Sequence, residues 1–320
     1  MSDSPSPQSF AALRHPGYRA YFIGSAMAMM ADSIEHVISY WIIFQEFHSP
    51  ALAGFAVIAH WLPFILFSVH AGALADRFDP RRVMQWGMVL FMGVSVGWGL
   101  LFLTDSLEMW HAMVLLALHG IAGVLWAPAG QMLIHDIVGP AQLQSGVRLL
   151  ATSRTLGFLL GPAIGGGMLL ALGPDWGIMV NALIYLPLTI WLVNAPYGPR
   201  FRKEGDFVPS AAIRGLGDIL ATVKNAASNP TIISMTLLAG AASLFVGNAH
   251  QAQMPEFSQD FGFGGSGLYY SILLAANGAG AVVAGLVLES KGFLEAKPRT
   301  AFILVLLWCL AIAGFAGVSS

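Results

Sequence analysis

Charge and cysteine are both scarce in this chain of 320 residues. Asp, Glu, Lys and Arg make up 10% of it, against about a quarter in ordinary soluble domains. The net charge of −2 offers no basic surface to a nucleic acid. The single cysteine, Cys309, excludes an internal disulfide. The apolar stretch after the polar first 17 residues is longer than a signal-peptide core, so we expect no cleavable signal peptide.

Hydrophobic residues, by contrast, form 56% of the chain and fall into repeated apolar blocks. Each block has about 20 residues, the length that crosses a hydrocarbon core of ~30 Å as a helix. A soluble protein of this size has no interior that could bury so many blocks. The sequence therefore predicts an all-α polytopic membrane protein with nine spans, at approximately 18–46, 51–72, 83–104, 109–136, 145–172, 176–194, 230–252, 266–288 and 300–319.

The connections between these spans are short and polar except for residues 195–229, which hold five basic residues. We expect a cytoplasmic linker there, with an amphipathic helix around 211–225. It would join an N-terminal six-helix domain at 1–194 to a C-terminal domain of three helices at 230–320. Gly72 and Asp76 in span two share their offset with Gly285 and Glu289 in span eight, as in two parallel six-helix halves.

A 6 + 6 architecture would have twelve spans, and only nine are present. We therefore expect a truncated product or a partial record. The alternative is a shorter variant that completes itself by association.

Basic residues predict the orientation of the spans. With the N-terminus in the cytoplasm, no outer loop contains Lys or Arg, and nearly all basic residues fall in cytoplasmic loops. Arg154 is the exception and lies within span five, in its cytoplasmic half. This bias follows the positive-inside rule and predicts a cytoplasmic N-terminus in an inner membrane of bacterial type.

Two motifs resemble those of a known family. The loop after span two reads Gly72-Ala-Leu-Ala-Asp76-Arg77-Phe-Asp79-Pro80-Arg81-Arg82. It is similar to the G-x-L-A-D-R-x-G-R-(K/R) signature of the major facilitator superfamily of transporters, with Asp79 and Pro80 replacing a glycine and a basic residue. Span five contains Gly157-Phe-Leu-Leu-Gly161-Pro162-Ala-Ile-Gly165-Gly166, which resembles the G-x-x-x-G-P-x-x-G-G pattern of antiporters in that superfamily. Residues 254–280 resemble its drug and siderophore exporter branch, which includes enterobactin and macrolide exporters.

This resemblance covers nearly the whole chain and implies a secondary transporter that works by alternating access. It also implies that Asp76 meets the start of helix eleven, where a carboxylate complements the positive end of the helix dipole by about 0.3–1 kcal/mol. One departure concerns coupling. The arginine common in span four of proton-driven drug exporters is absent, because Leu116 stands about where it would fall.

The charged loop at 72–82 has two interpretations. Arg77, Arg81 and Arg82 are either topology signals alone or parts of a gate. In the second interpretation, Arg77 pairs with Asp76 and with Asp136 at the inner end of span four. Such a latch would hold the outward-facing state and break during transport.

Span five carries a face of small residues. Gly157, Gly161 and Gly165 are spaced by four and so lie on one side of the helix, which Pro162 is expected to kink. This face either serves simple close packing or lies at the seam between the two halves, against Gly278, Gly280 and Gly285 of span eight. Arg154 lies near the same face, and either marks a water-filled cavity or reaches the inner surface.

Span one contains the acids most relevant to chemistry. Asp32, Glu35 and His36 are spaced i, i+3 and i+4, so they share a face near the bilayer midplane. An aspartate there costs roughly 2.5–3.5 kcal/mol to insert. Two neighbouring acids repel, so one of them can load and release a proton. The alternative is a structural pair of Asp32 with Arg154.

Other polar and aromatic residues occur within the spans. His60 and His119 are each interpreted as hydrogen-bonded packing elements. Trp41, Trp61 and Trp126 either line an aromatic cavity or sit at the membrane interfaces.

Motifs of other functional classes are missing. There is no H-E-x-x-H or G-x-S-x-G, so we expect no enzyme, cofactor or metal. The sequence predicts an inner-membrane exporter of a small amphipathic molecule, coupled to protons and monomeric at full length. A non-transporting receptor of the same fold, or a uniporter or symporter of a small metabolite, stays open as an alternative.

Overall fold

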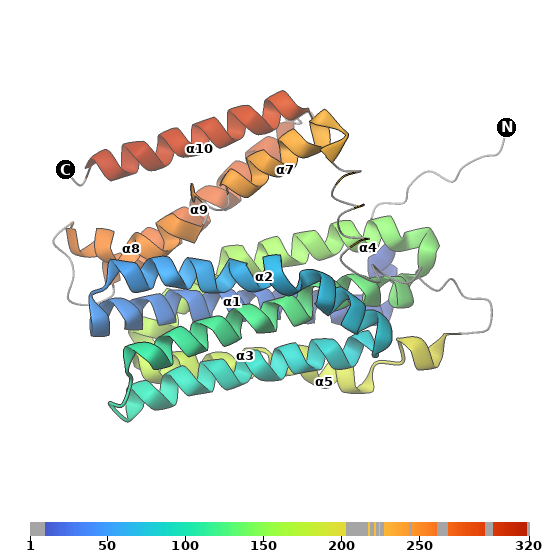
Figure 1. Cartoon of the computed structure of the whole chain (residues 1–320), viewed down its shortest axis with the longest axis horizontal. Coiled ribbons are helices and arrows are strands. Elements are labelled where there is room, and N and C mark those ends of the chain that lie inside the picture. The colour runs from blue at the N-terminus through green and yellow to red at the C-terminus, as the bar shows by residue number, and fades with distance from the viewer. Residues whose placement is uncertain are drawn as a thin grey trace.

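The computed structural model describes residues 10–202, 227–242, 245–246, 248–260, 268–291 and 297–318, together with positions 217, 221 and 224. Regular structure in this part of the chain is helical (Figure 1). The helices are η1 (Ala11–Arg14), α1 (Pro16–Phe47), α2 (Pro50–Arg77), α3 (Pro80–Leu103), α4 (Met109–Ile184), α5 (Leu186–Asn194), η2 (Pro199–Phe201), α7 (Pro230–Ala242), α8 (Asn248–Asp260), α9 (Leu268–Lys291) and α10 (Pro298–Val318).

The prediction of an all-α polytopic membrane protein is confirmed. Five helical stretches among the described residues are long and apolar enough to cross a membrane, namely Pro50–Ser68, Pro80–Leu103, Met109–Leu143, Ser145–Phe201 and Pro298–Gly317.

The first three long helices begin where local chemistry favours a helix start. Pro16, Pro50 and Pro80 occupy the first turn, where the N–H that proline lacks would have no partner in any case. The side chain of Ser49 accepts the N–H of Leu52 at 3.3 Å and caps α2. The bounds of α1, α2 and α3 lie within five residues of the predicted spans 18–46, 51–72 and 83–104.

Two glycines divide α4 into three successive helical stretches. Gly139 and Gly173 have φ values of 69° and 78°, a region that glycine enters without steric cost. Each precedes a proline, which disfavours helical geometry in the residue before it. The chain folds back at both breaks, since Gly146 lies against Ile134 and Gly177 against Met168. These stretches and α5 correspond to the predicted spans 109–136, 145–172 and 176–194.

Differences from the predicted spans occur in the second half. In the region of the predicted span 230–252 the described residues are helical. They comprise α7 up to Ala242, a π-helical turn at 245–246, and α8, which runs to Asp260 and so past the predicted end. The apolar run stops near residue 247, but the polar sequence after it still favours a helix, so hydropathy alone ends the span too early. The expected amphipathic helix at 211–225 falls outside the described residues, except for three helical positions at 217, 221 and 224.

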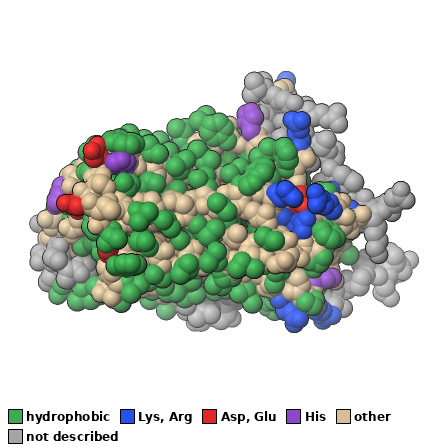
Figure 2. Space-filling model, turned by 90° about the horizontal axis from the view of Figure 1, so that it is seen from below, with side chains coloured by type: hydrophobic (Ala, Val, Ile, Leu, Met, Phe, Trp, Pro, Cys, Tyr) green, Lys and Arg blue, Asp and Glu red, His purple; other side chains and the backbone are tan. Residues whose placement is uncertain are grey.

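Helix α1 lies at the centre of the N-terminal half. Every residue from Ala31 to Ile43 except His36 is buried, so this stretch faces other helices rather than lipid. Hydrophobic side chains cover most of the face shown in Figure 2. Lys and Arg gather at one end with an acidic side chain among them, and the other acidic side chains in view lie toward the opposite end. We call the end that carries Arg77, Arg81 and Arg82 the basic end.

Candidate functional site: a polar cluster inside the helix bundle

Close contact between helix backbones brings polar side chains of different helices together. A Cβ on Gly120 of α4 would lie 2.2 Å from the carbonyl oxygen of Ala59 in α2. Only glycine permits this approach, and it sets His119 beside His60, whose rings are 5.7 Å apart. A Cβ on Gly161 would lie 2.4 Å from that of Ser33. The second stretch of α4 therefore packs directly against α1, one residue from Asp32.

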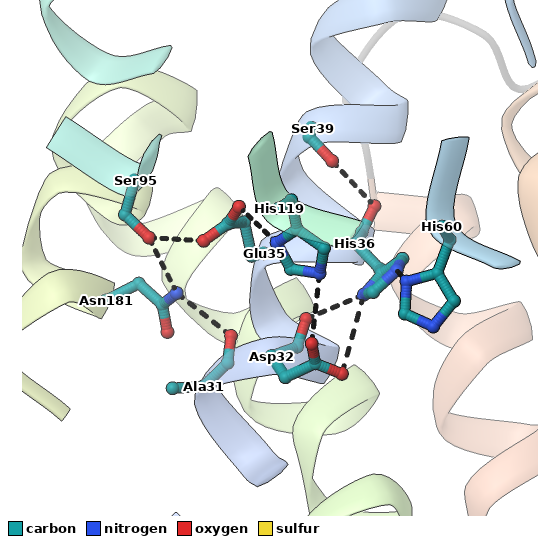
Figure 3. A network of polar contacts seen from close by, with 9 residues as sticks. All are labelled: Ala31, Asp32, Glu35, His36, Ser39, His60, Ser95, His119 and Asn181. Atoms are coloured by element: carbon teal, nitrogen blue, oxygen red, sulfur yellow. Dashed lines mark hydrogen bonds and ion pairs between the residues drawn. The ribbon is translucent and has the colours of Figure 1, made fainter. Parts of the chain in front are cut away.

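Five titratable residues meet where these helices cross, and we call them the polar cluster: Asp32, Glu35, His36, His60 and His119 (Figure 3). His119 lies between the two acids. Its Nδ1 donates to Oε1 of Glu35 at 2.7 Å, and its Nε2 is 3.0 Å from Oδ1 of Asp32. Nδ1 of His36 donates to the backbone oxygen of Asp32 at 2.7 Å, while its Nε2 is 3.2 Å from Nδ1 of His60.

Two neutral residues complete the hydrogen bonds around Glu35. The hydroxyl of Ser95 in α3 donates to Oε2 of Glu35. Asn181 of α4 donates to the Ser95 oxygen at 3.4 Å and to the backbone oxygen of Ala31 at 2.9 Å. Ser95 and Asn181 were not among the predicted site residues, because a single serine or asparagine in an apolar span gives no signal of its own.

The acids of the polar cluster and the histidine between them are buried. Asp32, Glu35 and His119 are 6%, 1% and 5% exposed. A buried carboxylate is costly unless it is paired, and both carboxylates find that partner in histidine. Histidine can change its charge near neutral pH, whereas arginine cannot. The arrangement can therefore hold or release a proton, or a cation, without separating the helices.

A second set of ion pairs lies at the basic end. Arg202 holds Asp136 through two parallel hydrogen bonds, of 2.9 Å from Nε and 3.0 Å from the terminal nitrogen. The predicted pair of Arg77 with Asp136 is therefore wrong. The side chain of Arg77 is exposed, while Arg202 follows α5 and reaches Asp136 with the planar geometry that suits a carboxylate.

The charged loop itself is tied to the end of α5. Arg81 is 9% exposed, binds Asp79, and donates to the backbone oxygen of Ala195. Burial of Asp79 opposes its ionisation, but the hydrogen bonds from Arg81 outweigh burial and hold its pKa below the usual value. Arg82 is exposed, and a Cβ at Gly72 would meet open space. The side chain of Asp76, and so its predicted contacts, lies outside the described part of the chain.

Comparison with known proteins gives the family. A family model described as transmembrane secretion effector matches residues 7–313. The chain belongs to this family of major facilitator transporters. Its members are transporters rather than enzymes, as predicted, and the similarity to an exporter branch of the superfamily is confirmed.

Curated relatives are similar to this chain at low identity. The chain is 22% identical over 274 residues to macrolide efflux protein A of Streptococcus pyogenes, covering 84% of this chain and 65% of that protein. It is 26% identical over 148 residues to the putative multidrug resistance protein MdtD of Cronobacter sakazakii, covering 45% of this chain and 30% of the relative. For MdtD of Salmonella typhi the identity is 24% over 197 residues, covering 61% and 40%. The chain thus spans less than two thirds of the length of these curated relatives.

Two predictions about the interior of this transporter need correction. His60 and His119, interpreted singly as packing elements, belong to the polar cluster. The alternative pair of Asp32 with Arg154 does not form, because Asp32 lies against His119. The guanidinium of Arg154 instead lies over the ring of Trp126, 5.5 Å from its centre, in a cation–π contact.

The antiporter-like motif packs mainly within the N-terminal half. Cβ atoms on Gly157 and Gly165 would meet α1, at 2.4 Å from the oxygen of Ala26 and 3.2 Å from Cα of Ile34. The expected seam with span eight forms in part. Gly166 lies against Ser271 of α9, and a Cβ on Gly278 would lie 3.1 Å from the backbone oxygen of Leu159. A Cβ on Gly280 would meet nothing within 4 Å, and the surroundings of Gly285 lie outside the described part of the chain. The correction has a physical cause, since the buried α1 offers the closest backbone to this glycine face. Pro162 lies inside α4, away from its two breaks.

The three tryptophans have separate surroundings. Trp41 stacks on Tyr270 of α9, with ring centres 5.4 Å apart. Trp61 lies 5.0 Å from His60, at the edge of the polar cluster. Trp126 packs against Phe91 and carries Arg154 on its face. Only Trp61 therefore contacts a residue of the polar cluster through the ring contacts seen in the described chain.

Proposed function

We propose that this protein exports a small amphipathic molecule from the cytoplasm in exchange for protons. The observation that supports this most is the burial of Asp32 and Glu35 at the middle of α1, in a member of a transporter family. One relative is named a macrolide efflux protein and another a putative multidrug resistance protein. A carboxylate at that depth is costly, and proton exchange is a reason for a transporter to keep one there. The name of the first relative makes a macrolide a suitable first substrate to test.

Asp32 is the proposed proton-carrying group. The titratable side chains that surround it come from several helices and are Glu35, His36, Tyr40, His60, His119 and Tyr185. When Asp32 takes up a proton from outside, its attraction to His119 weakens, and the interior of the bundle can change its arrangement. Release of that proton to the cytoplasm would reset the contact.

The proposal includes an orientation. Lys and Arg at the basic end would face the cytoplasm, in keeping with the positive-inside rule. The N-terminus would then be cytoplasmic, and the membrane would be the inner membrane of a bacterial-type cell.

A transport assay with two variants tests this function. In inside-out vesicles with an acidic interior, the unmodified protein is expected to accumulate a macrolide in the vesicle lumen. Asp32→Asn should reduce the proton-driven rate at least tenfold, because the amide cannot carry the proton. The matched control is Asp105→Asn, since Asp105 is an exposed aspartate of a loop.

The outcomes separate the parts of the proposal. Accumulation that does not depend on the proton gradient in the unmodified protein would exclude proton antiport. Undiminished accumulation by Asp32→Asn would remove Asp32 from the coupling step. If no compound in a panel of amphipathic molecules is transported or bound, export itself is wrong.

A further inference from the structure

We propose that His36, His60, His119 and Asp32 bind one divalent transition-metal ion, with Zn²⁺ as the best match. The inference goes beyond the proposed function, because binding at this site requires neither export nor a proton gradient. It rests on the ligand atoms that face one another, on the residues that hold these ligands from behind, and on two contacts whose distances are close to those between ligands of one ion.

The ligand atoms converge from three helices. One nitrogen from each of the three histidines lies within 4.8 Å of the other two. Tetrahedral zinc with bonds of ~2.0–2.1 Å places neighbouring ligand atoms about 3.4 Å apart. The His36–His60 distance of 3.2 Å and the His119–Asp32 distance of 3.0 Å already have this value. Closing the remaining gap takes a movement of about 1.5 Å, within reach of side-chain rotation.

Outer hydrogen bonds orient two of the histidines toward the site. Glu35 accepts the Nδ1 proton of His119 and is itself held by Ser95. The backbone oxygen of Asp32 accepts the Nδ1 proton of His36. In both rings Nε2 is thereby left as the metal-binding nitrogen. A carboxylate or carbonyl behind a histidine is the usual support of a metal ligand, and it fixes both the tautomer and the ring.

One contact in the polar cluster lies between two of the candidate ligands. Nε2 of His119 is 3.0 Å from Oδ1 of Asp32 and pairs with it. Two ligands of one tetrahedral ion lie at a similar separation. A bound ion would therefore take the place of this pairing without moving either side chain far.

The contact between His36 and His60 could likewise be replaced by a bound ion. Because Nδ1 of His36 carries its proton, the 3.2 Å contact needs a proton on Nδ1 of His60. An ion between the two nitrogens would replace that proton, which moves to Nε2 of His60 as the ring changes tautomer. The two positive charges of the ion are balanced by the carboxylate of Asp32 in the ligand set and by that of Glu35 behind His119.

Ligand chemistry selects the class of ion. Three imidazoles and one carboxylate suit Zn²⁺ and its transition-metal neighbours. Mg²⁺ and Ca²⁺ prefer sites made of oxygen ligands. His36 and His60 are only partly buried, which leaves a route for the ion from the surface to the ligand atoms.

Metal titration of the purified protein tests the inference. The protein should be prepared without a polyhistidine tag, stripped with a chelator, and titrated with Zn²⁺ alone in detergent by calorimetry. One ion per chain is expected. His60→Gln should weaken binding at least tenfold, and the matched control His70→Gln should leave it unchanged. His70 is on the same helix but exposed.

A supporting variant and a spectroscopic measurement make the test independent of any one substitution. Glu35→Gln removes a supporting residue and should weaken affinity by roughly 10–100-fold. X-ray absorption of zinc bound to the unmodified protein should show nitrogen and oxygen neighbours with the pattern of three imidazoles. Co²⁺ in place of zinc should give the absorption of a tetrahedral complex.

Three results would overturn the site: no stoichiometric binding by the unmodified protein, equal affinity in His60→Gln, or octahedral Co²⁺. Failure of export and failure of metal binding are distinguishable, because the titration contains no substrate and no proton gradient. A protein that binds zinc at these ligands but exports nothing would leave the inference standing and overturn the proposed function.

Discussion

The polar cluster and the basic end both contain paired charges, but the side chain that pairs with the carboxylates is histidine in the first and arginine in the second. Inside the bundle, Asp32 and Glu35 are paired with His119. At the basic end, Asp136 and Asp79 are paired with Arg202 and Arg81. Arginine stays charged at every physiological pH and binds a carboxylate through two parallel hydrogen bonds. Histidine can lose its charge or bind a metal through the same nitrogen.

This difference suggests a division of labour between two regions that lie on the same helices. Pairs made with arginine suit contacts that must hold the end of a helix in place. Pairs made with histidine suit a site whose charge changes. The predictions that follow test this comparison, beginning with the substitution that should have the largest effect.

The largest effect is expected in the polar cluster. His119→Ala leaves two buried carboxylates without their shared partner, so it should cost on the order of 3–5 kcal/mol of stability. The measurement is thermal unfolding in detergent, compared with Arg202→Ala at the basic end. An equal or larger loss in Arg202→Ala would break the comparison.

The next largest loss of stability is expected from a substitution that disturbs close packing and changes no charge. Gly161→Ala places a methyl group 2.4 Å from Cβ of Ser33, so α1 must move away from α4. Overpacking of this kind costs about 1–3 kcal/mol, and it should disturb the cluster without altering any of its residues. Gly167→Ala is the matched control, because a Cβ there meets nothing within 4 Å. Equal unfolding temperatures for the two variants would contradict the packing described for this face.

A smaller effect is expected from Arg202→Gln. The substitution removes the charge that pairs with Asp136, while the glutamine amide can still donate one hydrogen bond. The Arg202 side chain is 19% exposed, so a loss of about 1 kcal/mol is expected. Salt should reduce the difference from the unmodified protein, because the pair lies near water. Unfolding temperatures at low and high salt provide the measurement. A salt-independent difference would place this pair with the buried cluster rather than with the surface.

The smallest effect concerns Asp79 and pH. Its pKa is lowered in the folded protein, so its stabilising contribution is present above the unfolded pKa of about 3.9. That contribution is lost as the pH falls through the lower folded value. Unfolding temperatures of Asp79→Asn and the unmodified protein should therefore differ at pH 6 and converge below about pH 4. A gap that widens on acidification would reverse the assigned direction.

Much of the fold can be predicted from the sequence, because hydrophobic length, proline and glycine act locally. The turns at Gly139 and Gly173 follow from glycine–proline pairs, and α1 to α3 follow from apolar length. The bounds of α8 could not be predicted, since a polar stretch can be loop or helix until its surroundings are known. The partner of Asp136 likewise depended on the path of the chain after α5.

The polar cluster was predicted only for its α1 residues, because the spacing of Asp32, Glu35 and His36 can be seen within one helix. Yet the positions of His60 and His119 along their helices also indicate that they could join this cluster. His60 is 10 residues from the start of α2, His119 is 10 from the start of α4, and His36 is 11 from the end of α1. At 1.5 Å per residue all three lie at a similar depth, about 15 Å from one end of the bundle. Histidines at matched depths on different helices can meet. A metal site of this kind therefore cannot be predicted from the sequence of any single helix.

The contact between Tyr270 and α1 has a mechanical consequence. The tyrosine hydroxyl of α9 donates to the backbone oxygen of Val37 at 2.8 Å, and its ring stacks on Trp41. The polar cluster links α1, α2 and α4, and Ser95 of α3 is hydrogen-bonded to it, so these helices cannot slide past one another without breaking its contacts. The contacts of α9 with α1 through Tyr270 are fewer, so a movement of α9 relative to α1 would break only the hydrogen bond to Val37 and the stacking on Trp41. Because Val37 is the residue after His36, a rotation of α9 against α1 would act on the backbone directly beside a histidine of the polar cluster.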